Sequence, residues 1–318
     1  MPLTEHAWPR LNRYRKTAGA LCALLIIFGS APVLRAQTIR DGLMMGRNSF
    51  CTGFMYSHES WDQYWEGSLK RVNGNIGTLT TQSVSWVGNY GVTDRLNVIA
   101  MAPYMWTNAS QGTLRGMSGF QDVTVAAKYK LLDTALTDKG RLRTILLASA
   151  GTPMTDYVPD FQPMAIGLGA SRYSGRLTLD FRAKAGWFVT GSSAYTWRSN
   201  VTLDRPSYYT NGELFFGDQV EMSDVFDYTI SAGYKKGGLQ IPVSFSQQHT
   251  RGGGDIRRQD MPFISNRMNY SQVDAVVEYF LPQAKNFALR VNAAYNLDGR
   301  NVGQSTTLAA GFLYVFQF

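Results

Sequence analysis

The sequence predicts an all-β protein: a transmembrane antiparallel β-barrel of about 12 strands, with long extracellular loops and short periplasmic turns. Three observations support this fold class. Apolar and polar residues alternate along many segments, and after the N-terminal region no apolar run reaches the roughly 18 residues of a transmembrane helix. The chain also ends in "TTLAAGFLYVFQF", with an aromatic residue at every second position.

Residues 1–36 have the pattern of an export signal. Basic residues precede the apolar run Ala18–Phe28, "AGALCALLIIF", which has the length of a signal-peptide core and is short for a bilayer span. The small residue Ala36, just before Gln37, offers a cleavage point. We therefore expect a signal peptide at 1–36, a short periplasmic N-terminal segment at 37–48 and an outer-membrane barrel at 49–318. A retained membrane anchor is the alternative.

Charge and cysteine content exclude several classes of function. Removal of residues 1–36 takes five Lys/Arg and one acidic residue, so the formal charge falls from +8 to +4. No cluster of basic residues interleaved with aromatics indicates a nucleic-acid partner. Cys22 lies in the signal, and Cys51 alone supports neither an intramolecular disulfide nor a Cys-based zinc site. No metal or cofactor motif is found, so we expect no cofactor.

Alternation is clearest in "DVTVAAKYKL", "RLTLDFRAKAGWFV", "SQVDAVVEY" and "NFALRVNAAYNL". In the second of these, Leu177, Leu179 and Phe181 face one way, while Asp180 and Arg182 face the other. Such strands are long enough to cross a membrane when tilted. Their polar faces carry ions, which a dry core does not tolerate unpaired, so a soluble β-sandwich is the weaker alternative.

The alternation of apolar and polar residues predicts twelve strands along the chain. They are expected at 49–57, 77–90, 95–106, 120–131, 142–151, 162–173, 176–190, 223–235, 239–249, 268–281, 286–297 and 305–318. The connections alternate between short turns, such as "YGVTDR", "SRYSGR" and "KKGGL", and longer polar or aromatic segments. Outer-membrane barrels have this asymmetry between short periplasmic turns and long outer loops. Because several strands alternate weakly, ten or fourteen strands remain open.

The C-terminal stripe fits the last strand of such a barrel. The aromatic side chains face outward, toward lipid: Phe312, Tyr314, Phe316 and Phe318. The intervening residues face the interior, and pairing with the first strand removes the exposed edge. A terminal Phe after alternating aromatics resembles the signal that the bacterial outer-membrane insertion machinery reads. We therefore expect location in the outer membrane, with that machinery, outer-membrane lipid and lipopolysaccharide as partners.

One stretch resembles a known family. "SGFQDVTVAAKYKLL", residues 118–132, is similar to the Gly-x-Gly-Asp strand of the outer-membrane proteins named for the meta-pathway of phenol degradation, with Gln121 in place of the second glycine. "NYGVTDRLNV" and "APYMW" resemble the preceding hairpin of that family. The resemblance implies a channel or transporter for small, often aromatic, compounds. Related hydrocarbon transporters carry a longer N-terminal hatch than residues 37–48, which argues against a hatch mechanism here.

Charged residues on the inward faces are candidates for lining the lumen. They are Asp122, Lys128, Lys130, Asp180, Arg182, Lys184, Asp227, Asp274, Glu278 and Arg290. They could form a constriction that selects solutes, or an ion-pair network that fills a narrow barrel. Because both signs are present, the sequence favours the ion-pair network.

The longest connection, 191–222, is unusually aromatic. Its candidate site residues are Trp197, Tyr208, Tyr209, Phe215 and Phe216. The loop either folds inward and lines an apolar entry site, or extends the strands and their aromatic girdle beyond the membrane. The sequence does not decide between these two interpretations.

Catalysis finds little support in the sequence. Of the three histidines, His6 leaves with the signal, and His58 and His249 are expected at the outer rim of the barrel. We predict no catalytic residue and a passive channel for small hydrophobic or aromatic solutes. A largely closed structural or adhesive barrel is the alternative, and a lipid hydrolase using His58 or His249 is a weaker one.

Overall fold

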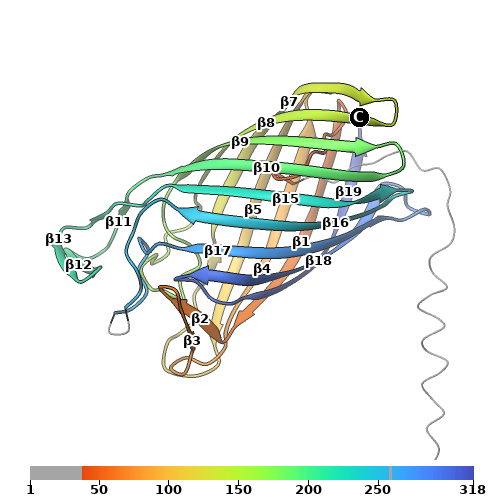
Figure 1. Ribbon diagram of the computed structural model, residues 1–318. Helices are drawn as coiled ribbons and strands as arrows, with labels where there is room; N and C mark the ends of the chain where they lie inside the picture. Colours follow the sequence, from red (N-terminus) through yellow and green to blue (C-terminus); the bar gives the residue numbers. More distant parts are fainter. Residues whose placement is uncertain (1–37, 258–259) are drawn as a thin grey trace, which may run out of the picture.

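Twelve long antiparallel strands form the wall of a closed barrel in the computed structural model, which describes residues 38–257 and 260–318 (Figure 1). The strands are β1 Ser49–Trp61, β4 Leu79–Gly91, β5 Leu96–Ala109, β7 Asp122–Thr137, β8 Gly140–Pro153, β9 Arg172–Ala183, β10 Trp187–Arg198, β15 Val225–Lys236, β16 Leu239–Thr250, β17 Asn269–Phe280, β18 Phe287–Arg300 and β19 Thr306–Gln317. The predicted number of barrel strands is confirmed. No helix within the described residues is long and apolar enough to cross a membrane.

Closure of the barrel depends on the first strands of the chain. β1 pairs with β19 on one side, from Ser49↔Gln317 onward, and with β4 on the other. The pairing of β4 with β5 completes the ring. The C-terminal strand therefore has partners on both sides, and its aromatic stripe does not lie on a free edge.

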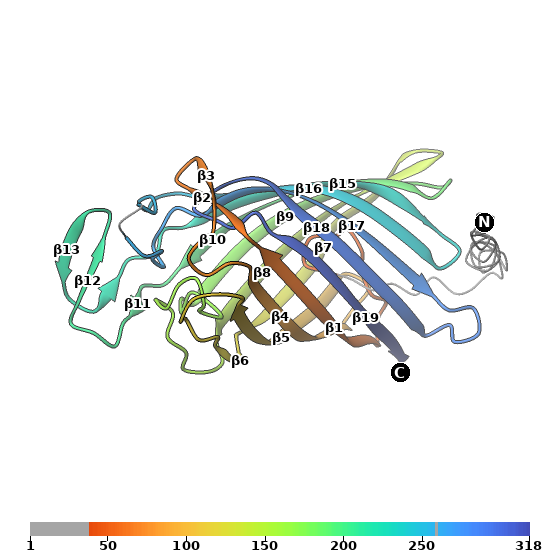
Figure 2. The same cartoon turned by 90° about the horizontal axis from the view of Figure 1, so that it is seen from below.

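Short turns gather at one end of the barrel and long loops at the other (Figure 2). The loops carry seven short strands: β2 Gln63–Glu66, β3 Leu69–Val72, β6 Ser118–Phe120, β11 Val201–Thr202, β12 Ser207–Thr210, β13 Glu213–Phe216 and β14 Gln219–Val220. The β12–β13 hairpin projects beyond the other loops (Figures 1 and 2). The C-terminus lies at the short-turn end, which corresponds to the periplasmic side of an outer-membrane barrel.

Two predicted strand positions are wrong. Residues 162–170 belong to a loop, and the predicted strand 176–190 is two strands, β9 and β10, joined by the turn 184–186. Gly186 has a φ of 105° in this turn, a value that favours glycine. Because the turn has three residues, odd-numbered side chains face outward both before and after it, so alternation alone does not reveal the reversal. "SRYSGR" is consequently the start of β9 rather than a turn.

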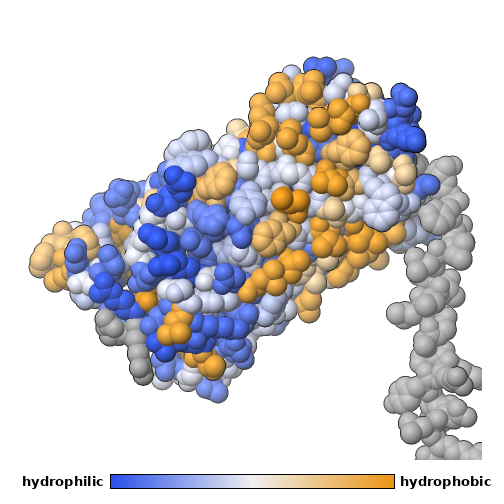
Figure 3. Space-filling view, viewed as in Figure 1, coloured by the Kyte–Doolittle hydropathy of each residue, from blue (hydrophilic) through white to orange (hydrophobic). Residues whose placement is uncertain are grey.

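The outer face is apolar and ringed by aromatic pairs. Near the periplasmic end, Trp187 packs on Tyr234 with ring centroids 5.2 Å apart, and Tyr314 packs on Phe316 at 4.7 Å. Near the loops, the rings of Tyr104 and its neighbour on β6 lie 5.2 Å apart. Hydrophobic residues gather over the strands toward the short-turn end, and hydrophilic residues cover much of the loop end (Figure 3). Two aromatic girdles around an apolar band are typical of a barrel that spans a membrane.

Candidate functional site: the barrel lumen

Residues 38–45, which precede β1, lie inside the barrel at its periplasmic end. We call Thr38–Asn48 the N-terminal segment. Leu43, Met44 and Met45 on this segment are buried, and Met45 belongs to a cluster of inward-facing residues on the barrel wall. Ile39 packs against a second such cluster on β5, β7 and β8. The sequence predicted a short periplasmic segment at 37–48; in the structure, apolar side chains of residues 38–45 fill part of the lumen.

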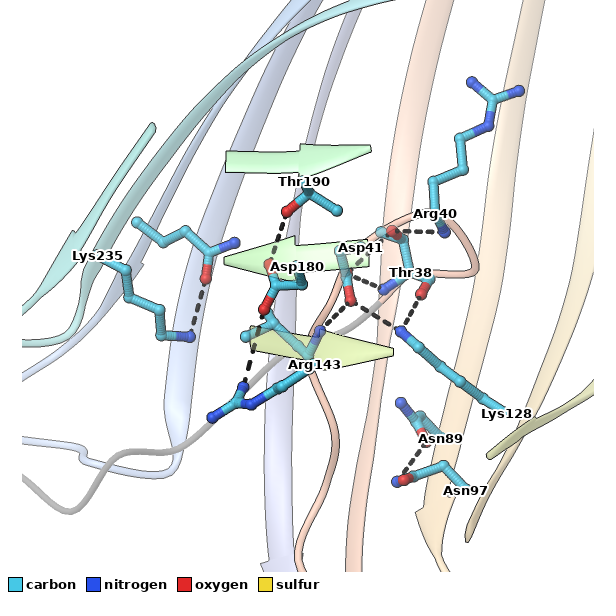
Figure 4. Close-up of polar contacts among 12 residues, drawn as sticks. Thr38, Arg40, Asp41, Asn89, Asn97, Lys128, Arg143, Asp180, Thr190 and Lys235 are labelled. Carbon is cyan, nitrogen blue, oxygen red and sulfur yellow. Dashed lines mark hydrogen bonds and ion pairs between the residues drawn. The ribbon is translucent and has the colours of Figure 1, made fainter. Parts of the chain in front are cut away.

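An ion pair fastens this segment to the wall. The Lys128 ammonium on β7 lies 2.9 Å from the Asp41 carboxylate and donates a further hydrogen bond of 3.0 Å to the Thr38 carbonyl (Figure 4). The Lys128 side chain is 1% exposed and that of Asp41 is 22% exposed. Asp41 also accepts a hydrogen bond of 2.9 Å from the Leu43 backbone, which stabilises a tight turn. A charge this buried needs a close partner, so the Lys128–Asp41 pair favours one position of the N-terminal segment on the barrel wall.

A second contact involves Asp180, which is fully buried on β9. Its carboxylate accepts hydrogen bonds of 2.6 Å from Thr190 and 2.6 Å from Arg182, and Arg143 lies 4.0 Å away. A Cβ atom added to Gly42 would lie 2.1 Å from Cγ of Asp180. Glycine at position 42 is therefore required for the close approach of the segment to the wall.

Other predicted lumen residues form ion pairs along the wall. Arg176 pairs with Asp227 at 2.7 Å, Arg290 with Glu278 at 3.2 Å and Lys130 with Asp133 at 3.2 Å. Asp122 lies at the loop end of β7, 2.9 Å from Arg172. Lys184 is an exception: it lies exposed in the turn between β9 and β10, because the strand it was assigned to ends at residue 183.

The sequence analysis missed five charged residues of this network: Asp41, Asp133, Arg143, Arg172 and Arg176. Arg176 was on the inward face of its predicted strand, so alternation contained the signal for it. Asp133 lies on the part of β7 near the periplasmic turn that extends beyond the predicted strand 120–131, whereas Arg143 lies within the predicted strand 142–151 and was not singled out. Asp41 precedes the first strand, where no periodicity applies.

A cavity of about 390 Å³ remains above the N-terminal segment. One wall, on β1, β4, β5 and β19, is largely apolar: Cys51, Val87, Ile99, Met101 and Leu313. The wall across the ring, on β15–β17, is rich in hydroxyl and amide groups: Thr229, Ser231, Ser244 and Gln272. Its hydroxyls bond to one another, as in the 2.9 Å contact between Ser231 and Ser244. The cavity therefore has one apolar and one hydrogen-bonding side.

Loops pack together over the opposite end of the barrel. The loop 154–171 places Met164 in one buried cluster with Ile76 and Leu79, and Ala170 in another that includes Phe263. The hydroxyl of Thr107 on β5 donates a 2.7 Å hydrogen bond to the Met164 carbonyl. The loop thus bridges two groups of loops at the extracellular end.

A hydrogen bond fixes the same loop to the rim. The Tyr157 hydroxyl donates to Asp122 at 2.7 Å. Burial of Tyr157, together with this bond to a carboxylate, raises the pKa of its phenol. Tyr157 therefore stays protonated and remains a hydrogen-bond donor at neutral pH.

The aromatic residues of the longest loop do not converge on an inward site. Trp197 lies on β10 with its side chain 52% exposed on the outer face. Tyr208 and Phe215 stack at 5.3 Å within the projecting β12–β13 hairpin. Tyr209 and Phe216 are exposed on the same hairpin, Phe216 by 88%. The structure thus agrees with strand extensions beyond the membrane rather than with an apolar entry site.

The two histidines outside residues 1–37 are not among the residues that line the cavity. His58 on β1 and His249 on β16 are on the outward-facing side of the wall, where their register partners are Leu308 and Phe226. Within the described part of the chain, no group of three His, Cys, Asp or Glu residues is placed to bind a metal ion. The four aromatic side chains of the C-terminal stripe are exposed on the outer face, as expected from alternation.

Comparisons with known proteins agree with this architecture. A family model described as "Putative MetA-pathway of phenol degradation" matches residues 53–312. The crystal structure of the COG4313 outer membrane channel from Pseudomonas putida F1 superposes with a TM-score of 0.65 at 18% identity, covering 89% of this chain and 100% of that one. This likeness shows a shared fold. A search of curated proteins found no match.

More distant barrels are also similar. The translocator domain of the autotransporter NalP from Neisseria meningitidis gives a TM-score of 0.45 at 9% identity, covering 87% of this chain and 91% of that one. The deltaS2 mutant of the TodX monoaromatic hydrocarbon channel gives 0.41 at 11% identity, covering 86% of this chain and 91% of that one. Scores this low support no inference about the present chain.

Proposed function

Because the chain belongs to the family described as "Putative MetA-pathway of phenol degradation" and forms a closed transmembrane-type barrel, we propose that it is an outer-membrane channel. Its solutes would be small hydrophobic or aromatic compounds that pass down their own concentration gradient. The resemblance predicted from residues 118–132 is confirmed by the family match over most of the chain.

The observation that carries this proposal is the cavity of about 390 Å³ inside the barrel. An apolar cavity of about 150 Å³ is sufficient to hold benzene. The apolar wall that includes Val87, Ile99 and Met101 offers an aromatic ring a surface where it is removed from water. The facing hydroxyl and amide groups suit a polar substituent on the same solute.

Passage to the periplasm requires the N-terminal segment to move, because it occupies the periplasmic end of the lumen. Within the described residues, its one ion pair with the barrel wall is that between Asp41 and Lys128. Opening would break this pair and the apolar contacts of Ile39 and Met45 without disturbing the strand pairing of the barrel. The channel is thus proposed to alternate between a closed form and an open one.

A largely closed structural barrel is a second candidate. The observation in its favour is that ion pairs line the lumen while the segment and the loop 154–171 close its two ends. The two candidates differ in whether a small solute crosses. We propose no catalytic role for either form.

Solute flux through the refolded protein in liposomes tests the channel. In wild type, toluene or benzyl alcohol should accelerate exchange above that of protein-free vesicles. Met101→Trp fills the cavity and should reduce the flux, whereas Ala100→Trp places the same ring on the outer face of the same strand and should not. Flux equal to that of empty vesicles for every solute would favour the structural barrel.

We also propose that residues 1–36, whose structure lies outside the described residues, are a cleaved export signal. Phe312, Tyr314, Phe316 and Phe318 would then guide the barrel insertion machinery. Edman sequencing of the mature N-terminus and insertion assays on a Phe318 deletion check these points.

A further inference from the structure

Arg40 stands out among the charged residues of the cavity. It lies on the N-terminal segment, next to Asp41, and its side chain extends away from Thr38 and Asp41 (Figure 4). Its backbone N–H donates to the Thr38 hydroxyl at 3.3 Å. Within residues 38–257 and 260–318, its guanidinium makes no hydrogen bond or ion pair. Five N–H donors on a fixed planar group thus lie in the cavity unused by the protein.

The other charged residues of the cavity have close partners. Asp41 pairs with Lys128, Arg182 with Asp180 and Glu278 with Arg290. Asp274 is hydrogen-bonded to Ser244 and lies in the fields of two cations, Arg40 and Arg290. Arg40 faces another cation, Arg176, as well as Asp274. Of the three cations in the cavity lining, Arg40, Arg182 and Arg290, only Arg40 has a guanidinium without a hydrogen bond or ion pair within the described residues.

A guanidinium matches a carboxylate in shape, because two parallel N–H groups can donate to its two oxygens. The hydroxyl and amide donors of the facing wall could complete the coordination of such a group. The apolar wall beside Arg40, with Ile39, Ile99 and Met101, would receive the remainder of the solute. A solute that satisfies both sides carries one carboxylate on a small apolar body.

We propose that Arg40 is the anion-binding residue of the lumen and that the preferred solutes are small carboxylates with an aromatic or short aliphatic body. This inference rests on the proposed channel function and names its substrate class. A carboxylate bound to Arg40 contacts the N-terminal segment, which closes the lumen. Arg40 is next to Asp41, which pairs with Lys128 on the barrel wall.

Three probes that share a ring and differ in charge test the proposal: benzoate, benzyl alcohol and benzylamine. Binding to the full-length folded protein in detergent is measured by isothermal titration calorimetry. Wild type should bind benzoate at least tenfold more tightly than the other two, the scale of one charge-assisted hydrogen bond. Arg40→Gln should remove that preference and leave benzyl alcohol unchanged, and Arg40→Lys should retain part of it.

Arg47→Gln is the matched control, because Arg47 is on the same segment but exposed. It should bind all three probes as wild type does. Equal benzoate binding by wild type and Arg40→Gln would overturn the proposal, as would a preference for benzylamine, which would assign recognition to Asp274. The heat-induced mobility shift on SDS gels verifies that each variant is folded, and should one fail, the wild-type series alone decides.

Flux measurements separate this inference from the channel proposal. Benzoate binding through Arg40 without flux of any probe would refute the channel and leave the site intact. Flux of all three probes at equal rates, with equal affinities, would support the channel and refute the carboxylate preference.

Discussion

Replacing Lys128 by methionine is expected to open the channel. The substitution removes the 2.9 Å ion pair to Asp41 and the 3.0 Å hydrogen bond to the Thr38 carbonyl, and keeps an apolar stem of similar length in the wall. It leaves the turn that Asp41 makes with Leu43 intact. The N-terminal segment should therefore stay folded on itself and lose the ion pair that attaches it to the barrel, while the apolar contacts of Ile39 and Met45 remain.

The size of the effect follows from the exposure of the two groups. A hydrogen bond to a charged group contributes about 1.5–3 kcal/mol, and the uncompensated carboxylate adds to the loss. Because Asp41 is 22% exposed, water solvates its carboxylate and offsets part of the lost free energy. We therefore take the free-energy cost of removing the pair as about 2 kcal/mol. The ratio of open to closed channels should then rise about 30-fold.

Single-channel recording in planar bilayers measures that ratio as the open probability. Lys130→Met is the control, since Lys130 is two residues further on the same face of β7 but pairs with Asp133. Combining Asp41→Asn with Lys128→Met removes the stranded carboxylate and should recover part of the closed population. If Lys128→Met and Lys130→Met both record as wild type does, the ion pair does not hold the closed form.

Three further outcomes are expected. Asp227→Asn strands the buried Arg176 guanidinium and should lower the barrel's unfolding free energy by about 3 kcal/mol in urea titrations; an unchanged midpoint would contradict the pairing. Lys184→Cys should react with a bulky thiol reagent added to the periplasmic side, since the residue lies in an exposed turn rather than in the lumen; absence of labelling would restore the lumen assignment. Hydrogen bonds from Arg300 lower the pKa of Asp255, so the ordering that this contact gives the loop 251–268 should be fully present above the carboxyl's ordinary pKa and be lost as pH falls through the lower folded value; protection of the loop from hydrogen exchange that does not fall at any acidic pH would contradict this.

Alternation along the strands specified which side chains face lipid, but not where each strand ends. In "RLTLDFRAKAGWFV" the pattern runs unbroken through the turn at 184–186, because three turn residues leave the parity of the outward face unchanged. The two predicted strands around this turn were therefore displaced by about ten residues from the observed ones. Their inward and outward faces were still assigned correctly, and of the predicted lumen residues only Lys184 lies outside the lumen. Gly186 was the local signal for the turn.

The sequence by itself determined the barrel and the outward aromatic stripe that ends at Phe318, and it favoured twelve strands, because each depends on period-two patterning that a membrane imposes on every strand. Tertiary structure alone decided how the lumen is filled. The N-terminal segment has no periodicity, and its place depends on Lys128, Asp180 and Gly42, which lie far apart in the sequence and meet only when the barrel closes. The closed ring brings charged side chains into a narrow lumen, where the buried Lys128 pairs with Asp41 and Arg40 faces the cavity.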